Sequence, residues 1–201
     1  YNALNLNNIR NVIYYIVRMK ILLTNNYNPE LLTIGNVKDK SIGVYYPIED
    51  KSEEFSKLRI QTPRFKIPFN PDERKTKENK IFVKNISLST DEIGTDLNKK
   101  NANTFRMKIE ETDQKIKFLL PPPYNEKNLS PSLWQSKNLT YKPTMRITLP
   151  YSDEVCKTAV YNEKDDKIQD TDVCRNSVIS AIIRLDGIWL WGDKMGVNWV
   201  A

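Results

Sequence analysis

The stretch LRIQTPRFKIPF, residues 58–69, decides the predicted fold class. Apolar residues at positions 58 and 60 alternate with Arg59 and Gln61, which is the pattern of a strand with one buried face. Pro63 and Pro68 then interrupt the strand. Because proline has no backbone N–H to donate, we expect this segment to lie at a sheet edge or at the rim of a barrel.

Between the two prolines lie Arg64, Phe65 and Lys66. We expect them to form an exposed rim that carries basic groups and an exposed aromatic ring. Such a rim suits a charged polymer with stackable rings, as single-stranded nucleic acids are. The alternative is an ordinary edge strand that runs into a loop and binds nothing.

Short alternating or apolar segments recur along the chain and predict further strands. They cover residues 12–23, 31–37, 41–47, 80–89, 104–110, 115–120, 140–151, 178–185, 188–191 and 197–201. The apolar run at residues 12–23 is too continuous to separate strand from helix by its period, and its Val, Ile and Tyr content favours a strand. Residues 90–103 read as a polar connection, Asp186-Gly187 is typical of a hairpin turn, and no segment has a clear helical period. This spacing is typical of a small barrel or a sandwich, and we expect an all-β, OB-fold-like barrel with long loop insertions.

The length of 201 residues is enough for one domain with a core. We assign residues 1–30 to an N-terminal extension with the first strand, and residues 31–201 to the OB-fold-like domain. Since the sequence stops at Ala201 within a predicted strand, we expect a truncated C-terminus. The apolar run at residues 12–23 is interrupted by Arg18 and Lys20, so it is too short and too charged for a membrane span.

Composition narrows the function classes. The net charge of +6 permits nucleic acid as a partner without requiring it. The chain has no histidine, which removes the usual general base near neutral pH and the commonest zinc ligand. Cys156 and Cys174 are too few for a zinc site, and no secretory signal supports a disulfide between them, so we interpret them as reduced thiols of an intracellular protein.

Catalytic signals are poor. The chain has no G-x-S-x-G, P-loop or H-E-x-x-H motif, and its acidic residues lie scattered in polar loops. We therefore predict a protein that is not an enzyme and has no cofactor and no metal. The weakest alternative is a nuclease whose Mg²⁺ is held by carboxylates from distant loops.

Binding signals are better, because basic and aromatic residues recur at outward positions and near the ends of predicted strands. Phosphates would meet the basic residues, and bases would stack on the rings. For any single residue, a charged outer strand face or a core tryptophan remains the alternative. The predicted nucleic-acid-binding residues are Arg59, Arg64, Phe65, Lys66, Arg106, Lys108, Trp134, Tyr141, Arg146, Arg184, Trp189 and Trp191.

A family resemblance points the same way and covers residues 58–201. It is carried by Gln61-Thr62-Pro63, Pro68-Phe69, Tyr141 with Pro143, and Ile188-Trp189 followed by Gly192, Lys194, Gly196 and Trp199. In these motifs and their order, the chain resembles the single-stranded-DNA-binding proteins of nucleocytoplasmic large DNA viruses. That group shares its OB-fold with the replication proteins of short-tailed phages.

The resemblance implies a protein that coats single-stranded DNA during viral DNA replication and recombination, at the replication site in the host cytoplasm or nucleus. The implied partners are single-stranded DNA, replication proteins such as polymerase and helicase-primase, and further copies of the chain; no membrane is implied. It also implies that Gly192 and Gly196 are turn glycines. The phage relatives end in an acidic tail, which is absent up to Ala201. A structural β-sandwich virion or scaffold protein without a nucleic-acid role is the alternative.

Overall fold

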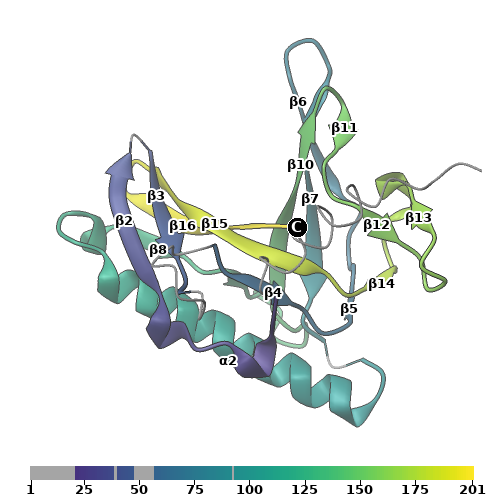
Figure 1. The fold of residues 1–201 in the computed structure, drawn as a ribbon, viewed down its shortest axis with the longest axis horizontal. Helices are drawn as coiled ribbons and strands as arrows, with labels where there is room; N and C mark the ends of the chain where they lie inside the picture. Colours follow the sequence, from purple (N-terminus) through teal and green to yellow (C-terminus); the bar gives the residue numbers. More distant parts are fainter. Residues whose placement is uncertain (1–20, 39, 48–56, 92) are drawn as a thin grey trace, which may run out of the picture.

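The computed structural model describes residues 21–38, 40–47, 57–91 and 93–201. One large mixed sheet and one long helix, α2 (Asp96–Leu119), form two layers, with the helix along one face of the sheet (Figure 1). The prediction of an all-β fold is confirmed in part, because strands dominate the described chain and α2 is the exception. Among the described residues the sheet is open, because its main path runs from β1 to β14 without closing.

The main path has the order β1-β4-β15-β16-β10-β7-β5-β14, and six further strands pair with strands of this path or with one another. The strands on this path are β1 (Leu22–Leu23), β4 (Arg59–Gln61), β15 (Ile182–Trp191), β16 (Lys194–Val200), β10 (Thr144–Ser152), β7 (Ile81–Ser89), β5 (Phe65–Lys66) and β14 (Val178–Ile179). The additional strands are β2 (Thr33–Lys38), β3 (Ser41–Tyr45), β6 (Asp72–Lys75), β8 (Asn128–Ser130), β9 (Leu133–Trp134) and β11 (Val155–Cys156).

Short elements complete the chain. A separate two-stranded sheet is formed by β12 (Val160–Tyr161) and β13 (Lys167–Ile168). Four 3₁₀ turns are described: η1 (Thr24–Asn26), η2 (Pro29–Leu31), η3 (Tyr124–Glu126) and η4 (Asp170–Asp172). Of the predicted strand at residues 12–23, positions 12–20 lie outside the described residues, and Leu22–Leu23 form β1.

The hairpin of β15 and β16 lies at the centre of the sheet. The C-terminal half of β15 pairs with β3, and its N-terminal half pairs with β4. Strand β16 pairs with β15 along nearly the whole length of β16. At the end of β16, Val200 pairs in parallel with Thr148 of β10, and β10 pairs with β7 over seven residues. In Figure 1 the β2–β3 pair and the β7–β10 pair therefore stand on opposite sides of the yellow hairpin.

The helix α2 corrects the prediction of strands at residues 104–110 and 115–120 and of a connection at residues 90–103. Phe105, Ile109 and Ile116 are fully buried at helical spacing, whereas Met107 is 60% exposed. Phe105 and Ile109, four residues apart, thus belong to an apolar helical stripe, and Met107 lies outside it. Thr95 caps the helix, because its hydroxyl accepts a hydrogen bond from the backbone N–H of Asn98.

The core lies between the helix and the inner face of the sheet. Phe65, which we expected to be exposed, is fully buried there, and its ring lies 5.3 Å from the ring of Phe105. Strand β4 has a partner on each side, so the expectation that it lies at a sheet edge is also wrong. Both strands nevertheless stop before the adjacent proline, as predicted, since β4 ends at Gln61 and β5 at Lys66.

The predicted turn at Asp186-Gly187 is instead a bulge within the continuous strand β15. A side chain at Gly187 would bring its Cβ within 2.8 Å of the carbonyl oxygen of Ile42, so the close approach of β3 requires glycine here. The true turn contains Gly192, whose φ is +57°. Gly196, expected in a turn, lies within β16. In the part of the chain that the structure describes, no helix is long and apolar enough to cross a membrane.

Candidate nucleic-acid interface

Strand register divides the sheet into two faces. The inner face carries Ile60, Ile147, Ile183 and Ile188, which belong to the core cluster shared with α2. Their strand neighbours point the other way, since side chains alternate along a strand. We call this second surface, directed away from α2, the outer face.

Three of the predicted arginines share the outer face. Arg59 pairs in register with Arg184, Arg184 pairs with Val200, and Val200 pairs with Thr148. This row therefore crosses β4, β15, β16 and β10. Arg146 lies two residues before Thr148 on β10 and is directed to the same side.

The arginines of the outer face differ in how their charge is balanced. Arg146 is ion-paired to Asp72 at 2.5 Å. Asp186 accepts from both Lys57, at 2.5 Å, and Arg184, at 3.0 Å. Burial opposes ionisation of Asp186, but the hydrogen bond and charge of Lys57, together with Arg184, lower the pKa of that carboxyl.

Arg59 has no such partner among the residues that the structure describes. Within the described part of the chain, its polar contact is a 3.4 Å hydrogen bond to the carbonyl oxygen of Lys57, and no carboxylate lies within ion-pair distance. Burial and then the charge of Arg184 lower the pKa of the Arg59 guanidinium. Among the described residues at this end of the outer face, the carboxylate of Asp186 pairs with Lys57 and Arg184 and leaves Arg59 without an acidic partner.

Trp189 lies flat on the outer face. It pairs in register with Gly196 of β16, and a Cβ built at Gly196 would lie 2.5 Å from Cζ2 of the indole. The ring therefore occupies the space that a side chain at position 196 would fill. One side of the ring covers the strand, and Trp189 remains 39% exposed.

Trp191 extends this aromatic surface. It is directed to the same face as Trp189 and is 74% exposed, with the ammonium group of Lys40 located 5.7 Å from the centre of its ring. A shallow pocket of about 320 Å³ adjoins it and is lined by Lys40, Tyr124, Lys127, Leu190, Trp191 and Gly192. Lys127 donates a hydrogen bond to the carbonyl oxygen of Gly192 at its rim.

Tyr45 is an aromatic residue of the outer face that sequence reasoning missed. Its ring covers Gly35 of β2 and Gly43 of β3, where a built Cβ would lie 2.8 Å and 2.7 Å from atoms of the Tyr45 side chain. A signal was present in the sequence, since both glycines lie within predicted strands close to this tyrosine. We call Tyr45, Trp189 and Trp191 the aromatic platform.

A second register row carries two more predicted residues. Lys66 of β5 pairs with Ser89 of β7, Ser89 pairs with Thr144 of β10, and Thr144 pairs with Trp134 of β9. Lys66 is exposed and Trp134 is 58% exposed. Because Leu133 and Met145 point into the core, this row lies on the outer face.

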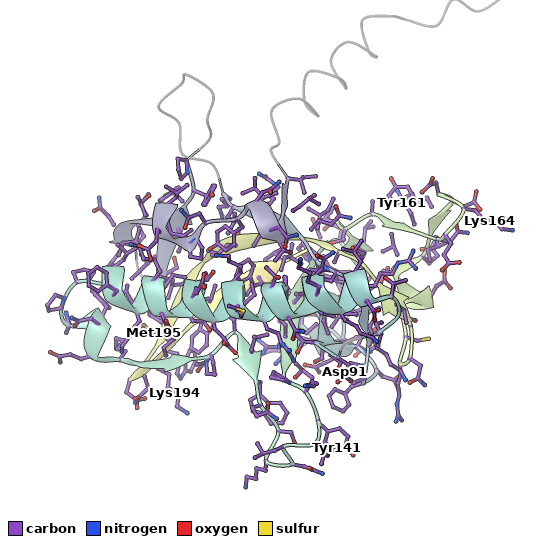
Figure 2. The ribbon with its side chains drawn as sticks, turned by 90° about the horizontal axis from the view of Figure 1, so that it is seen from below. Asp91, Tyr141, Tyr161, Lys164, Lys194 and Met195 are labelled. Atoms are coloured by element: carbon purple, nitrogen blue, oxygen red, sulfur yellow. The ribbon has the colours of Figure 1, made fainter. Side chains whose placement is uncertain are left out.

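The remaining predicted residues lie elsewhere. Arg106 and Lys108 are on α2, across the sheet from the outer face, and Lys108 is ion-paired to Glu111 at 2.9 Å. Arg64 is exposed, and its backbone N–H and C=O bond the side chain of Asn98 near the start of α2. Tyr141 is 65% exposed on a segment that projects from the body of the protein in Figure 2. With Phe65 in the core, these five residues do not join the platform.

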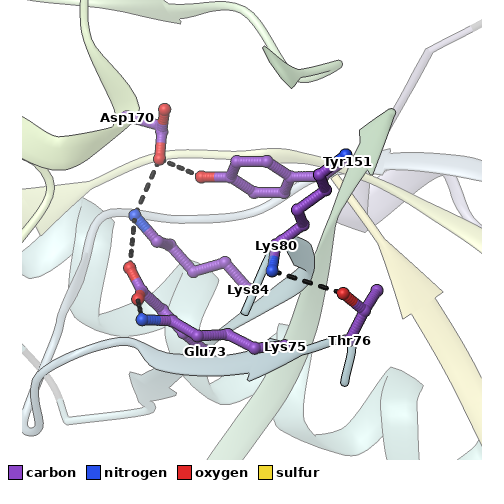
Figure 3. Close-up of polar contacts among 7 residues, drawn as sticks. All are labelled: Glu73, Lys75, Thr76, Lys80, Lys84, Tyr151 and Asp170. Carbon is purple, nitrogen blue, oxygen red and sulfur yellow. Dashed lines mark hydrogen bonds and ion pairs between the residues drawn. The ribbon is translucent and has the colours of Figure 1, made fainter. Parts of the chain in front are cut away.

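A buried polar cluster, separate from the outer face, has a structural explanation. The ammonium group of Lys84 lies 2.8 Å from Asp170 and 3.4 Å from Glu73, and Tyr151 also donates to Asp170 (Figure 3). Burial works against the charge on Lys84, but Asp170 and Glu73 raise its pKa. Every charge has a partner, so the cluster binds the segment around η4 to β7 and β10.

No group of three or more His, Cys, Asp or Glu side chains that could hold a metal ion is found among the described residues. No protein-family model matches the sequence, and no curated protein matches it.

Proposed function

We propose that this chain is a sequence-tolerant single-stranded DNA-binding protein and that the outer face of its sheet carries the DNA. The observation that supports this most strongly is the flat placement of Trp189 on Gly196, beside the exposed Trp191 and on the same face as Arg59 and Arg184. Flat, accessible rings and cations with few acidic partners are the two features that unpaired nucleic acid requires.

Base stacking explains why we propose single-stranded DNA rather than duplex DNA as the ligand. The exposed rings of the platform offer π-faces on which unpaired bases can stack, at about 1–3 kcal/mol per base. Bases within a duplex have both faces covered by their neighbours and cannot reach these rings. Since any base has a π-face, the stacking carries little sequence preference.

Arginine and lysine side chains of the same face supply the electrostatic contribution. Phosphates bound to them release condensed counterions, so the affinity falls as salt is added. The basic residues that the register places on this face include Arg59, Arg184, Arg146, Lys66 and Lys194.

The finer assignments belong to the same proposal. We infer an OB-type sheet and a role in coating DNA during viral replication and recombination, with replication proteins and further copies of the chain as partners. These rest on the motif resemblance at residues 58–201, and the single sheet with one covering helix is compatible with them.

The test is equilibrium binding of fluorescent oligo-dT of about 30 nucleotides and of a duplex of equal length, at several salt concentrations. We expect tight binding of oligo-dT, weak binding of duplex, quenching of tryptophan fluorescence, and a linear loss of log affinity with log salt. Equal affinity for both DNAs, or affinity for oligo-dT that does not depend on salt, would contradict the proposal. Absence of binding to either DNA would instead favour the structural-protein alternative.

A further inference from the structure

Two arginines face each other directly across neighbouring strands. Arg59 of β4 and Arg184 of β15 are register partners, and both are only partly exposed. Like charges directly opposite each other on a sheet are destabilising. The nearby carboxylate of Asp186 bonds Lys57 and Arg184 and leaves Arg59 without an acidic partner in the described chain.

Hydrogen bonding at this pair is also incomplete. The Nε atom of Arg184 is buried and has no hydrogen-bond acceptor among the described residues. A buried donor that lacks an acceptor is destabilising, because it has lost its hydrogen bond to water. The Arg59–Arg184 pair therefore combines unbalanced positive charge with an unused donor, and a bound anion would balance the charge.

We propose that Arg59 and Arg184 form a discrete phosphate-binding subsite, which holds a backbone phosphate when single-stranded DNA lies on the outer face. This inference rests on the proposed function for the source of the phosphate, but not for the site itself. Two guanidinium groups present fixed, planar sets of donors that match the oxygens of a phosphate group. Lysine in either position would keep the charge but lose this geometry.

The position of the subsite fits a strand that also reaches the platform. Arg184 and Trp189 are both on β15, five residues apart, and extended chain of that length spans about 16 Å. A short stretch of unpaired DNA along β15 can therefore place a phosphate on the arginine pair and a base on Trp189.

The first experimental arm uses inorganic phosphate as the probe. Thermal unfolding of the wild type and Arg59→Gln is measured in sodium phosphate and in sodium chloride of equal ionic strength. We expect phosphate to raise the melting temperature of the wild type by several degrees and to leave that of Arg59→Gln unchanged, because only a native-state site is stabilised by its ligand. In chloride, Arg59→Gln should melt at the same temperature as the wild type or higher, since a like-charge pair has been removed.

A purely structural role for Arg59 gives the opposite signature. Arg59→Gln would then melt well below the wild type in chloride, or phosphate would raise its melting temperature as much as that of the wild type. Either result overturns the subsite. Lys108→Gln on α2 is the control and should respond to phosphate as the wild type does.

The second arm uses oligo-dT and identifies the source of the phosphate. Arg59→Gln should bind about tenfold more weakly, with a log–log salt slope smaller by about 0.7, whereas Lys108→Gln should be unchanged. If the wild type binds oligo-dT and Arg59→Gln matches it in affinity and slope, the subsite is refuted while the proposed function stands. If phosphate stabilises only the wild type but oligo-dT does not bind, the proposed function fails and the site serves free phosphate or another phosphorylated ligand.

Discussion

Trp189 can lie flat on the sheet because position 196 has no side chain. A large aromatic ring that covers a glycine on the neighbouring strand is a known way to stabilise a sheet, so the arrangement has a purely structural use. Tyr45 covers Gly35 and Gly43 in the same manner. The structural use does not explain why Trp191 stands beside them with 74% of its surface exposed. The exposed ring of Trp191 is therefore the reason, at the scale of single residues, to propose that this face binds DNA.

Asp113 is a titrating group inside the core. Its carboxylate accepts from the backbone N–H and the hydroxyl of Ser132, each at 2.7 Å, and Trp199 donates to the same hydroxyl. Burial raises the pKa of Asp113 to about 6, although the hydrogen bonds from Ser132 oppose the shift. The group therefore binds its proton more tightly in the folded chain than in the unfolded chain.

The sign of the resulting pH dependence follows from the raised pKa. Asp113 contributes most stability below about pH 4, the ordinary range of the carboxyl, and this contribution is lost as the pH rises through about 6. We predict that the free energy of unfolding of Asp113→Asn increases relative to that of the wild type by about 2 kcal/mol between pH 4 and pH 7. Urea unfolding of both proteins across that range is the measurement. A difference between them that stays constant with pH would refute the raised pKa.

At the scale of elements, the helix α2 shows where the sequence pattern was insufficient. Its buried positions include Ala102, Thr112 and Asp113 as well as Phe105 and Ile109. Three of these five are small or polar, so the apolar stripe is weak when read from the sequence alone. The local alternation around Phe105 then favoured a strand, and only packing against the sheet decides for a helix.

The Lys84 cluster joins β7 to the segment around η4. Burial would raise the pKa of Asp170, but hydrogen bonds from Lys84 and Tyr151 lower it. Only 5% of the Lys84 side chain and 13% of the Asp170 side chain are exposed. Removal of one partner therefore leaves a largely buried charge without compensation.

We predict that Lys84→Met lowers the free energy of unfolding by about 2 kcal/mol at neutral pH, less than for a fully buried pair because Glu73 keeps contact with solvent. The deficit should shrink as the pH falls through the depressed pKa of Asp170, since protonation of Asp170 also breaks the pair in the wild type. Chemical denaturation at neutral and acidic pH measures both effects.

Lys80→Met is the matched control for this prediction. Lys80 is ion-paired to Glu78 at 3.9 Å, and both side chains are more than half exposed. Its replacement should change the free energy of unfolding by less than about 0.5 kcal/mol. An equal loss in free energy of unfolding for the two variants would show that burial of the Lys84 cluster contributes nothing to stability.

At the scale of the whole molecule, local alternation was enough to place Arg59, Arg146 and Arg184 on outward strand positions. It could not show that β4 and β15 are neighbours, so the opposition of Arg59 and Arg184 was not predictable. It also did not show that Gly196 lies beneath Trp189, because Gly196 was expected in a turn, whereas the turn is limited to Gly192 and Asp193 and Gly196 belongs to β16. Long-range register, which no local pattern encodes, assembles the outer face.

The helix α2 separates some of the predicted nucleic-acid-binding residues from the outer face. With Arg106 and Lys108 on α2 and Phe65 beneath the sheet, the basic and aromatic residues do not surround the molecule evenly. The outer face keeps both residue types together, while the opposite side presents α2. This asymmetry predicts that only one side of the protein binds DNA.

The two sides offer a closely matched pair of residues. Trp191 on the outer face is 74% exposed, with Lys40 located 5.7 Å from its ring centre, and Phe118 on α2 is 81% exposed, with Lys115 at the same distance. Both rings can be removed with little effect on the core. Replacing each ring in turn therefore tests whether DNA binding depends on which side of the protein carries the ring or only on the ring being exposed.

The dissociation constants of Trp191→Ala and Phe118→Ala for oligo-dT test the central claim most directly. We predict that Trp191→Ala binds about tenfold more weakly than the wild type and that Phe118→Ala binds like the wild type. Wild-type affinity of Trp191→Ala, or an equal loss in both variants, would contradict the assignment of the outer face as the surface that binds single-stranded DNA.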